Sequence, residues 1–163
     1  NHNDDYARGK RKEKNMKLKQ LSVFLENKPG QLLLPCKALS DAGVNIHTLC
    51  LADTQQFGIL RLVVEDWKAA KEILEQNGCV VKLTDVVAIE VEDRPGGLAR
   101  IIDILDKGRV NIEYMYAFTF GRNNRAVLIF RFDDPDSAVE LLDSEGIGIV
   151  GAPDFFKLAG NGK

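Results

Sequence analysis

The chain has 163 residues, an apolar content of 45% and a formal net charge of −2 at pH 7. This length admits one domain or two small ones, and the ordinary apolar content is typical of a soluble globular protein. A net charge this close to zero excludes the global positive field that draws proteins to nucleic acid or anionic membranes, so we expect a small-molecule ligand.

The first 17 residues are predicted to be a flexible tail, because their basic side chains show neither an aromatic ladder nor an amphipathic period. No stretch approaches the ~18 consecutive apolar residues of a membrane span, and no secretory segment begins the chain. We therefore expect no membrane contact and a cytoplasmic location. Three cysteines without a Cys-x-x-Cys pair predict neither a disulfide framework nor a zinc site, and we expect buried thiols in a reducing cytosol at Cys36, Cys50 and Cys79.

Alternating apolar residues from Leu21 to Leu25 predict the first strand. The loop Glu-Asn-Lys-Pro-Gly follows over residues 26–30, and apolar residues at helical spacing then predict a helix that ends near Gly43. Pro35 should make this helix start late or bend, because proline lacks a backbone N–H and crowds the preceding turn.

A hairpin is predicted next, with one strand ending at Ala52 and the other running from Gly58 to Glu65. Asp66 is a suitable N-cap for a second helix, which Gly78 should end before a strand over residues 79–83. The predicted order is βαββαβ.

The second half repeats this order. A shift of 66 residues pairs identical residues through the second strand, and a shift of 68 does so after the hairpin, where Gly121-Arg122-Asn123-Asn124 lengthens the turn. The pairs include Glu26/Glu92, Pro29/Pro95, Gly30/Gly96, Leu32/Leu98, Asn45/Asn111, Leu60/Leu128, Asp66/Asp134 and Gly78/Gly146. We predict one domain over residues 18–84, a second over 85–152 and a C-terminal extension over 153–163, in which Phe155-Phe156 prolongs the last strand.

Each repeat is so small that its own hydrophobic core would be only marginally stable, so we expect the two halves to pack together. A split βαβ repeat places both helices on one face of a four-stranded antiparallel sheet. The predicted fold class is α+β, with two ferredoxin-like βαββαβ repeats joined side by side into an eight-stranded antiparallel sheet that carries its helices on one face.

The face of this sheet away from the helices is also expected to be apolar. Its predicted members are Phe24, Leu49, Leu51, Ile59, Val63, Met115, Ala117, Val127 and Ile129. No further element of the chain is expected to cover this face, so we predict a homodimer that forms through it. The alternating aromatic residues Tyr114, Tyr116, Phe118 and Phe120 share the parity of Ile112 and are expected in the core, although such a stripe can also stack RNA bases.

The repeated loop, with Gly43-Val44-Asn45-Ile46 opening the second strand, resembles the ACT domain, a ferredoxin-like module that binds amino acids and regulates enzymes of amino-acid metabolism. The resemblance covers about residues 19–150 as a tandem pair and is strongest to the serine-binding ACT domains of phosphoglycerate dehydrogenases. It implies ligand contacts by Asn27 and Asp93 in the loops, and by Asn45 and Asn111 from the partner repeat. Serine specificity is not implied, because Leu25 and Val91 stand where those relatives place a histidine.

The residues themselves indicate the same class of ligand. Backbone N–H groups at a helix start favour a carboxylate, and the Asn27 carbonyl or the Asp93 carboxylate can accept hydrogen bonds from an ammonium group. The predicted ligand-binding residues are Asn27, Pro29, Gly30, Gln31, Leu32, Asn45, Asp93, Pro95, Gly96, Gly97, Leu98 and Asn111. His47 and Glu113 could line the ligand pocket, contact a dimer partner or lie on a plain surface.

We therefore predict a non-catalytic regulatory module that senses a free amino acid at the interface between its repeats and communicates with a possible enzyme partner. The sequence contains no nucleophile motif, metal-ligand spacing or glycine-rich phosphate loop, so no catalytic residue, metal or cofactor is predicted. Two alternatives are a regulatory fragment of a larger amino-acid-metabolism enzyme and a ferredoxin-like RNA-binding module, whose basic sheet surface is missing here.

Overall fold

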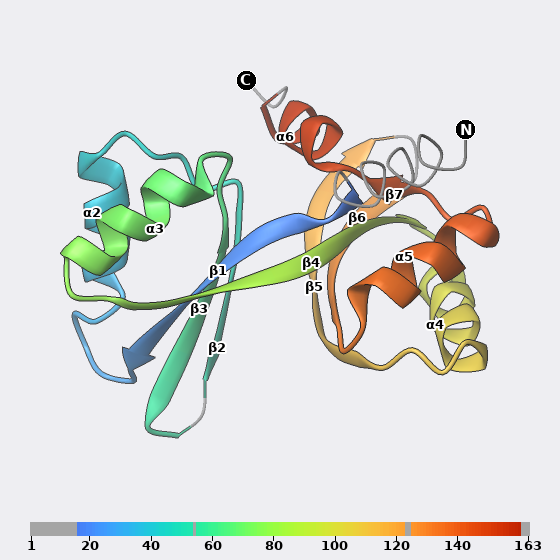
Figure 1. Ribbon diagram of the computed structural model, residues 1–163, viewed down its shortest axis with the longest axis horizontal. Helices are drawn as coiled ribbons and strands as arrows, with labels where there is room; N and C mark the ends of the chain where they lie inside the picture. The colour runs from blue at the N-terminus through green and yellow to red at the C-terminus, as the bar shows by residue number, and fades with distance from the viewer. Residues whose placement is uncertain (1–15, 54, 123–124, 161–163) are drawn as a thin grey trace, which may run out of the picture. The chain divides into compact units, whose positions relative to one another are not determined.

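The structure is a computed structural model that describes residues 16–53, 55–122 and 125–160 (Figure 1). Residues 1–15 of the expected 17-residue tail and part of the expected turn, Asn123-Asn124, lie outside the described residues. The chain divides into two compact units: Lys19–Thr84, called repeat one below, and the residues from Asp85 onward together with the described ones up to Leu18, called repeat two. Each unit has its own helices and its own hydrophobic core. The last two residues of the expected tail are described: Met16 packs against the core of repeat two, and Lys17 makes an ion pair with Asp136.

Repeat one contains the strands β1 (Leu18–Glu26), β2 (Thr48–Asp53) and β3 (Phe57–Val63), and the helices α2 (Leu33–Asp41) and α3 (Trp67–Gln76). The first part of β4 (Val80–Glu92) completes it, and its strand order is β2-β3-β1-β4. Strand β3 pairs antiparallel with both β1 and β2. This is the order of a split βαβ unit.

Repeat two begins with the second part of β4 and continues with α4 (Gly97–Lys107), β5 (Ile112–Arg122), β6 (Arg125–Phe132), α5 (Pro135–Ser144), β7 (Ile149–Val150) and α6 (Ala152–Gly160). Its strands follow the order β5-β6-β4, with β7 paired to β4. The α+β class is confirmed. The described residues form seven strands instead of the predicted eight, because β4 runs without a break through the expected linker Thr84-Asp85 and serves both repeats.

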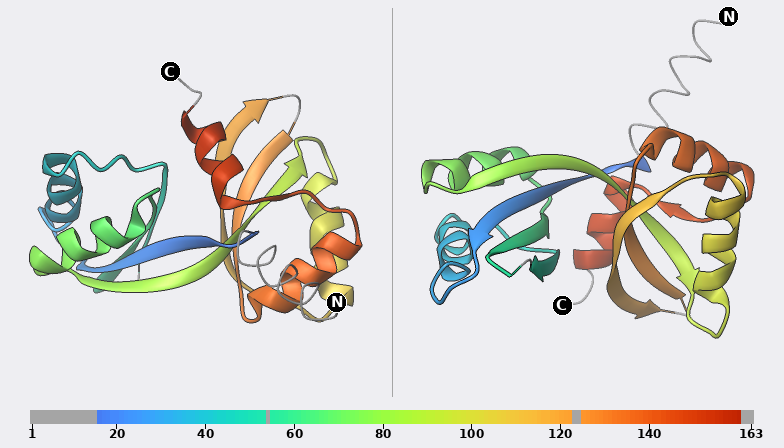
Figure 2. Two further views of the ribbon diagram at one scale, coloured as in Figure 1. Left: turned by 45° about the horizontal axis from the view of Figure 1, so that its top comes forward. Right: turned by 90° about the horizontal axis from the view of Figure 1, so that it is seen from below.

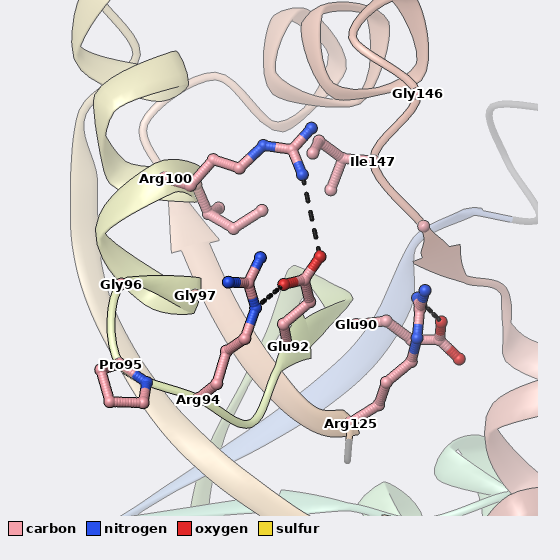
Figure 3. A pocket seen from close by; sticks show the side chains of 12 residues that line it. Glu90, Glu92, Arg94, Pro95, Gly96, Gly97, Arg100, Arg125, Gly146 and Ile147 are labelled. Atoms are coloured by element: carbon pink, nitrogen blue, oxygen red, sulfur yellow. Dashed lines mark hydrogen bonds and ion pairs between the residues drawn. The ribbon is translucent and has the colours of Figure 1, made fainter. Parts of the chain in front are cut away.

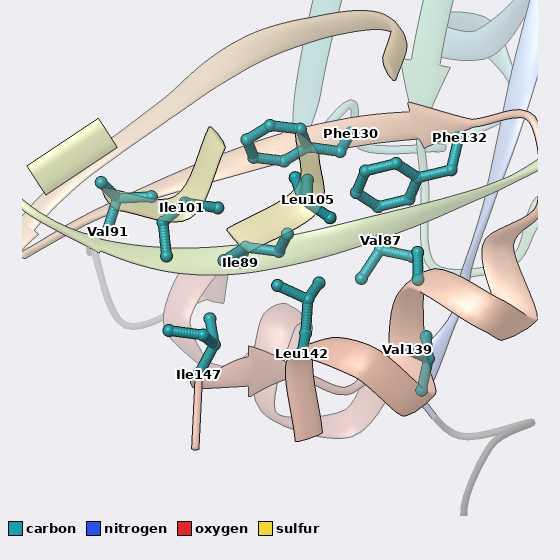
Figure 4. Packing of buried hydrophobic residues seen from close by; sticks show 11 residues of the cluster. Val87, Ile89, Val91, Ile101, Leu105, Phe130, Phe132, Val139, Leu142 and Ile147 are labelled. Carbon is teal, nitrogen blue, oxygen red and sulfur yellow. The ribbon is translucent and has the colours of Figure 1, made fainter. Parts of the chain in front are cut away.

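Apolar side chains hold the two helices of each repeat on one face of its strands. In repeat two, β4 and β6 meet α4 and α5 in a cluster that includes Ile89, Ile101, Leu105, Phe130 and Leu142 (Figure 4). Repeat one has an equivalent core of Leu21, Val23, Leu25, Leu39, Leu60, Leu62, Val64, Ala70 and Leu74. These strand residues face the helices as predicted.

Local sequence signals explain how the helices begin. The side chain of Asp66 accepts a hydrogen bond from the backbone N–H of Ala69 at 3.1 Å, and that of Asp134 accepts one from Ser137 at 3.2 Å. Hydrogen bonds from Ser137 lower the pKa of Asp134, so this cap is ionised at neutral pH. Helix α2 starts late, at Leu33, and this places Pro35 in the first turn, where a missing N–H breaks no intrahelical bond.

In the second strand of each repeat, the apolar side chains that were predicted to point away from the helices lie on the face toward the helices. Leu49 and Leu51 pair with the helix-facing Leu62 and Leu60, and Met115 pairs with the core residue Phe130. Ala117 likewise pairs with Leu128, which packs against the core of repeat two. In β5 a register shift between Ile112 and Tyr114 reverses the alternation, because one extra residue turns every later side chain to the other face.

Tyr116 and Phe118 therefore lie on the face away from the helices, paired with Ile129 and Val127, and not in the core beside Ile112. Val127 and Ile129 face this way as predicted. The side chain of Phe120 lies outside the described residues.

The C-terminal segment is a helix and not the predicted strand extension. Figure 2 shows α6 on the face of the repeat-two strands opposite α4 and α5. Phe155 of α6 is fully buried, and its ring centroid lies 4.7 Å from that of Phe118. The expectation that no element of this chain covers the second face was therefore wrong for repeat two, where α6 covers part of it.

Cys36, Cys50 and Cys79 are free and half-buried rather than fully buried. Burial raises the pKa of the Cys79 thiol, so Cys79 is protonated at neutral pH. Of the helices that the structure describes, none combines the length and the apolar character needed to cross a membrane.

Candidate functional site

The two Pro-Gly loops fold into the same turn. In repeat one, the backbone N–H of Lys28 donates to the carbonyl of Glu26 at 2.9 Å, and that of Gln31 donates to the carbonyl of Lys28 at 3.3 Å. In repeat two, Arg94 and Gly97 make the corresponding bonds to Glu92 and Arg94 at 2.9 and 3.0 Å. Gly30 and Gly96 both have φ near +87°, a conformation that strongly favours glycine.

The loops differ in where the helix starts. Helix α4 begins at Gly97, directly after the turn, whereas α2 begins at Leu33, two residues past the equivalent Gln31. A Cβ atom on Gly97 would lie only 2.0 Å from the carbonyl oxygen of Glu92. The start of α4 is thus fitted tightly against the end of β4.

This close fit forms one wall of a pocket of about 200 Å³ in repeat two (Figure 3). Its other walls come from the ends of β4 and β6 and from the loop between α5 and β7. The lining residues are Glu90, Glu92, Arg94, Pro95, Gly96, Gly97, Arg100, Ile101, Arg125, Gly146, Ile147 and Gly148.

Charged side chains dominate the pocket, and most of them are paired. Arg125 Nη1 lies 2.9 Å from Glu90 Oε2, and Arg94 Nε makes a close ion pair with Glu92. Arg100 Nη1 lies 4.0 Å from the second carboxylate oxygen of Glu92. The hydrogen bond and positive charge of Arg94, helped by Arg100 and Arg125, hold the pKa of Glu92 below its usual range.

Several predicted site residues lie at this pocket, and others lie beside it. Pro95, Gly96 and Gly97 line it, whereas Asp93 in the loop and Leu98 in the first turn of α4 do not. The sequence reasoning missed the arginines and glutamates. Comparison of the two repeats could have pointed to Arg100, because this charged residue corresponds to the apolar Leu34 at the shift of 66 residues.

The remaining predicted residues are distributed over both units. In repeat one, Asn27 to Leu32 form the loop between β1 and α2, and Asn45 is exposed in the segment before β2. In repeat two, the exposed Asn111 exchanges hydrogen bonds with Asp133 just before β5, each at 3.2 Å. Each predicted composite site combines the Pro-Gly loop of one unit with an asparagine of the other, and this combination stays a prediction.

The two residues with several possible roles have local contacts. The backbone N–H of His47 donates to the carbonyl of Val63 at 3.0 Å. Glu113 accepts a hydrogen bond from Arg131 Nε at 3.1 Å, and the same arginine donates to the carbonyl of Asp85 at 3.0 Å. Glu113 thus takes part in a polar network across repeat two.

Repeat one has a hollow of different character. It measures about 360 Å³ and is lined by Gly30, Leu33, Leu34, Lys37, Ala38, Asp41 and Asn77. Lys37 and Asp41 form an ion pair at 2.9 Å, and Leu33 and Leu34 are largely exposed. The same fold therefore presents a mainly apolar hollow in one repeat and a charged pocket in the other.

Comparison with known proteins places this architecture in a family. Residues 16–159 match the family described as the ACT domain pair. A solved protein from Bacteroides thetaiotaomicron is 39% identical, with a TM-score of 0.81 over 87% of this chain and 97% of that one. The ligand-free regulatory subunit of aspartate kinase from Thermus thermophilus shares the fold at 15% identity, with a TM-score of 0.57 over 80% of this chain and 94% of that one.

A curated relative is the acetolactate synthase small subunit of Buchnera aphidicola subsp. Baizongia pistaciae (strain Bp), which is 34% identical over 80 residues, or 48% of this chain. The matched region spans 50% of that relative's length. The family match extends over nearly all of the described residues and includes both Pro-Gly loops and all but the last residue of α6. The chain therefore belongs to the ACT domain family, as a pair of ACT domains.

Proposed function

We propose that this ACT pair is a non-catalytic regulatory module that binds a free amino acid at its Pro-Gly loops. The observation that carries the proposal is the duplicated turn, with the same backbone hydrogen bonds and the same positive φ at Gly30 and Gly96. Backbone N–H groups at such a turn suit a carboxylate, and a neighbouring polar side chain suits the ammonium group of the same ligand. This function requires no catalytic residue.

The proposed ligand sites are composite. Asn27, Pro29, Gly30, Gln31 and Leu32 act with Asn111, and Asp93, Pro95, Gly96, Gly97 and Leu98 act with Asn45. Asp93 carries a full negative charge where Asn27 is neutral, so the two sites should bind one amino acid with unequal affinity. Ligand binding would favour one arrangement of the repeats over others and so transmit occupancy to a partner.

Calorimetric titration of the full chain against the twenty amino acids tests this function. Binding of at least one amino acid is expected, with weaker affinity in Asn27→Ala or Asp93→Ala. Gln55→Ala in the exposed β2–β3 turn of repeat one is a matched control and should leave the affinity unchanged. Twenty flat titrations would refute amino-acid sensing.

The partners follow from the exposed surface and from the relatives. Phe24 and Phe57 lie on the side of repeat one away from the helices and are 44% and 55% exposed, and we propose that this side packs on a second copy of the chain. Light scattering should then show a dimer, and Phe57→Glu should convert it to a monomer. A monomeric wild type would rule the homodimer out.

We also propose a cytoplasmic enzyme of amino-acid metabolism as the regulated partner, because one relative is a small subunit of acetolactate synthase. The alternative is that the pair is the regulatory part of a longer enzyme chain. A copurified enzyme subunit would support the first arrangement, and a catalytic domain in the same open reading frame would support the second.

A further inference from the structure

The charged pocket of repeat two has one cation that is weakly held. Arg94 and Arg125 are each in close contact with a glutamate, at Glu92 and Glu90. Arg100 instead reaches Glu92 only at 4.0 Å, a distance too long for a hydrogen bond. Figure 3 shows the Glu92 carboxylate between the Arg94 and Arg100 side chains. The guanidinium of Arg100, whose side chain is 63% exposed, can therefore turn to a ligand without breaking a close ion pair.

The charge of the pocket defines the ligand that fits it. Three arginines and two glutamates leave one net positive charge. An acidic amino acid carries two carboxylates and one ammonium group at neutral pH, so its net charge of −1 complements the pocket. A neutral amino acid would leave Arg100 without a full counter-charge, and a doubly charged phosphate would meet repulsion from Glu90 and Glu92.

The comparison with repeat one indicates that these charges are not required by the fold. The residues equivalent to Glu90, Arg100, Arg125 and Gly148 are Phe24, Leu34, Phe57 and Val80. The strand register supports this equivalence, because Glu26 pairs with Phe57 as Glu92 pairs with Arg125. The four apolar residues are 44%, 46%, 55% and 66% exposed, so repeat one folds with no charge at any of these positions.

One ion pair is shared by the two repeats, and the other charged features of the pocket are not. The ion pairs Lys28–Glu26 and Arg94–Glu92 occur in both, so they belong to the loop itself. The Glu90–Arg125 pair and Arg100 occur in repeat two alone. Gly148 also leaves room there, since a Cβ atom at that position would lie 3.3 Å from Glu90 Oε2. The residues special to repeat two are thus the ones that give its pocket charge and space.

We propose that this pocket binds an acidic amino acid, with the ligand's side-chain carboxylate on the Arg100 guanidinium and its ammonium group on the Glu92 carboxylate. The planar guanidinium can donate two parallel hydrogen bonds to a carboxylate, and this geometry favours it over a point charge. The pocket volume of about 200 Å³ is small for an organic ligand and suits a metabolite of this size. The inference rests on the proposed amino-acid-binding function and names the ligand class of its repeat-two site.

Calorimetric titrations of the full chain with L-aspartate, L-glutamate, L-asparagine and L-glutamine test the inference. At least one acid should bind about tenfold or more tightly than its amide, a ratio that corresponds to one charge-assisted contact. Arg100→Leu, which installs the repeat-one residue, should remove this preference. Lys107→Leu removes the same charge from the same helix, where Lys107 pairs with Asp103, and should leave the preference intact.

The outcomes separate the two proposals. Equal affinity for an acid and its amide, or an acid preference that survives in Arg100→Leu, would overturn the acidic-ligand assignment while amino-acid sensing stands. An absence of binding by all twenty amino acids would overturn both. The comparison of acid with amide uses the wild-type chain, so it decides the question even if a variant fails to fold.

Discussion

Gly97→Ala is a sharp test of the fit between β4 and α4. The added carbon would lie 2.0 Å from the carbonyl oxygen of Glu92, whereas a carbon and an oxygen normally approach to about 3.3 Å. The obstacle is a backbone atom that accepts the N–H of Arg94 at 2.9 Å, so it cannot swing aside as a side chain would. Relief requires the start of α4 to move away from the end of β4.

The magnitude follows from two opposing effects. Overpacking of this kind costs about 1–3 kcal/mol of unfolding free energy. Replacing glycine by alanine returns up to ~1 kcal/mol, because alanine has the higher helix propensity. Because the clash at 2.0 Å is with a backbone atom, the upper end of the overpacking range applies, and the net expectation is a loss of about 2 kcal/mol, or a decrease of roughly 4–8 °C in Tm for a chain of this size.

Urea denaturation followed by circular dichroism measures this loss. The control is Gly160→Ala, where the added carbon meets nothing within 4 Å and the free energy should change by less than ~0.5 kcal/mol. A Gly97→Ala variant as stable as the wild type would refute the reasoning, because it would mean that the loop yields without cost.

Three further predictions concern separate elements. Phe155→Ala removes a fully buried ring that lies against Phe118, and Phe-to-Ala changes in a core cost about 3–5 kcal/mol. Because a nine-residue helix is not stable alone, the backbone amides of α6 should lose their protection from hydrogen exchange in this variant. Retained protection would contradict the anchoring of α6 by Phe155. Asp66→Ala removes the cap of α3 and should lower the free energy of unfolding in urea by about 1 kcal/mol, an effect that an unchanged midpoint would disprove. Arg94 lowers the pKa of Glu92, so this carboxylate stabilises the fold above its unfolded-state pKa of about 4.3 and loses that effect as the pH falls through its lower folded-state pKa. The Tm difference between wild type and Glu92→Gln should therefore vanish in acid. A Tm difference that stays constant with pH would contradict this prediction.

Signals that act over a few residues could be predicted from the sequence. Asp66 and Asp134 cap helices because a carboxylate can bond to an N–H three residues ahead, whatever the rest of the chain does. The late start of α2 likewise follows from the chemistry of Pro35. The internal repeat allowed the whole element order to be predicted, because the same signals occur at matching positions in both halves.

Features that depend on a single inserted residue or on distant partners could not be predicted in this way. The register shift after Ile112 leaves no clear mark in the composition of β5, yet it reverses the facing of Met115 and Phe118. The pair Phe155-Phe156 is a short apolar run, which suits a strand and a helix equally well. Arg100 and Arg125 lie in different elements, and only the folded chain brings them to one pocket.

The position of α6 after the sheet that it covers sets an order of events during synthesis. A chain leaves the ribosome from its N-terminus, so β5 and β6 can pair before Ala152–Gly160 has emerged. During this interval Phe118 and Val127 face water, and an exposed apolar sheet surface of this kind is prone to bind chaperones and to self-associate. The docking of Phe155 buries part of that surface, so the apolar face of β5 and β6 stays exposed to water until α6 has packed against it.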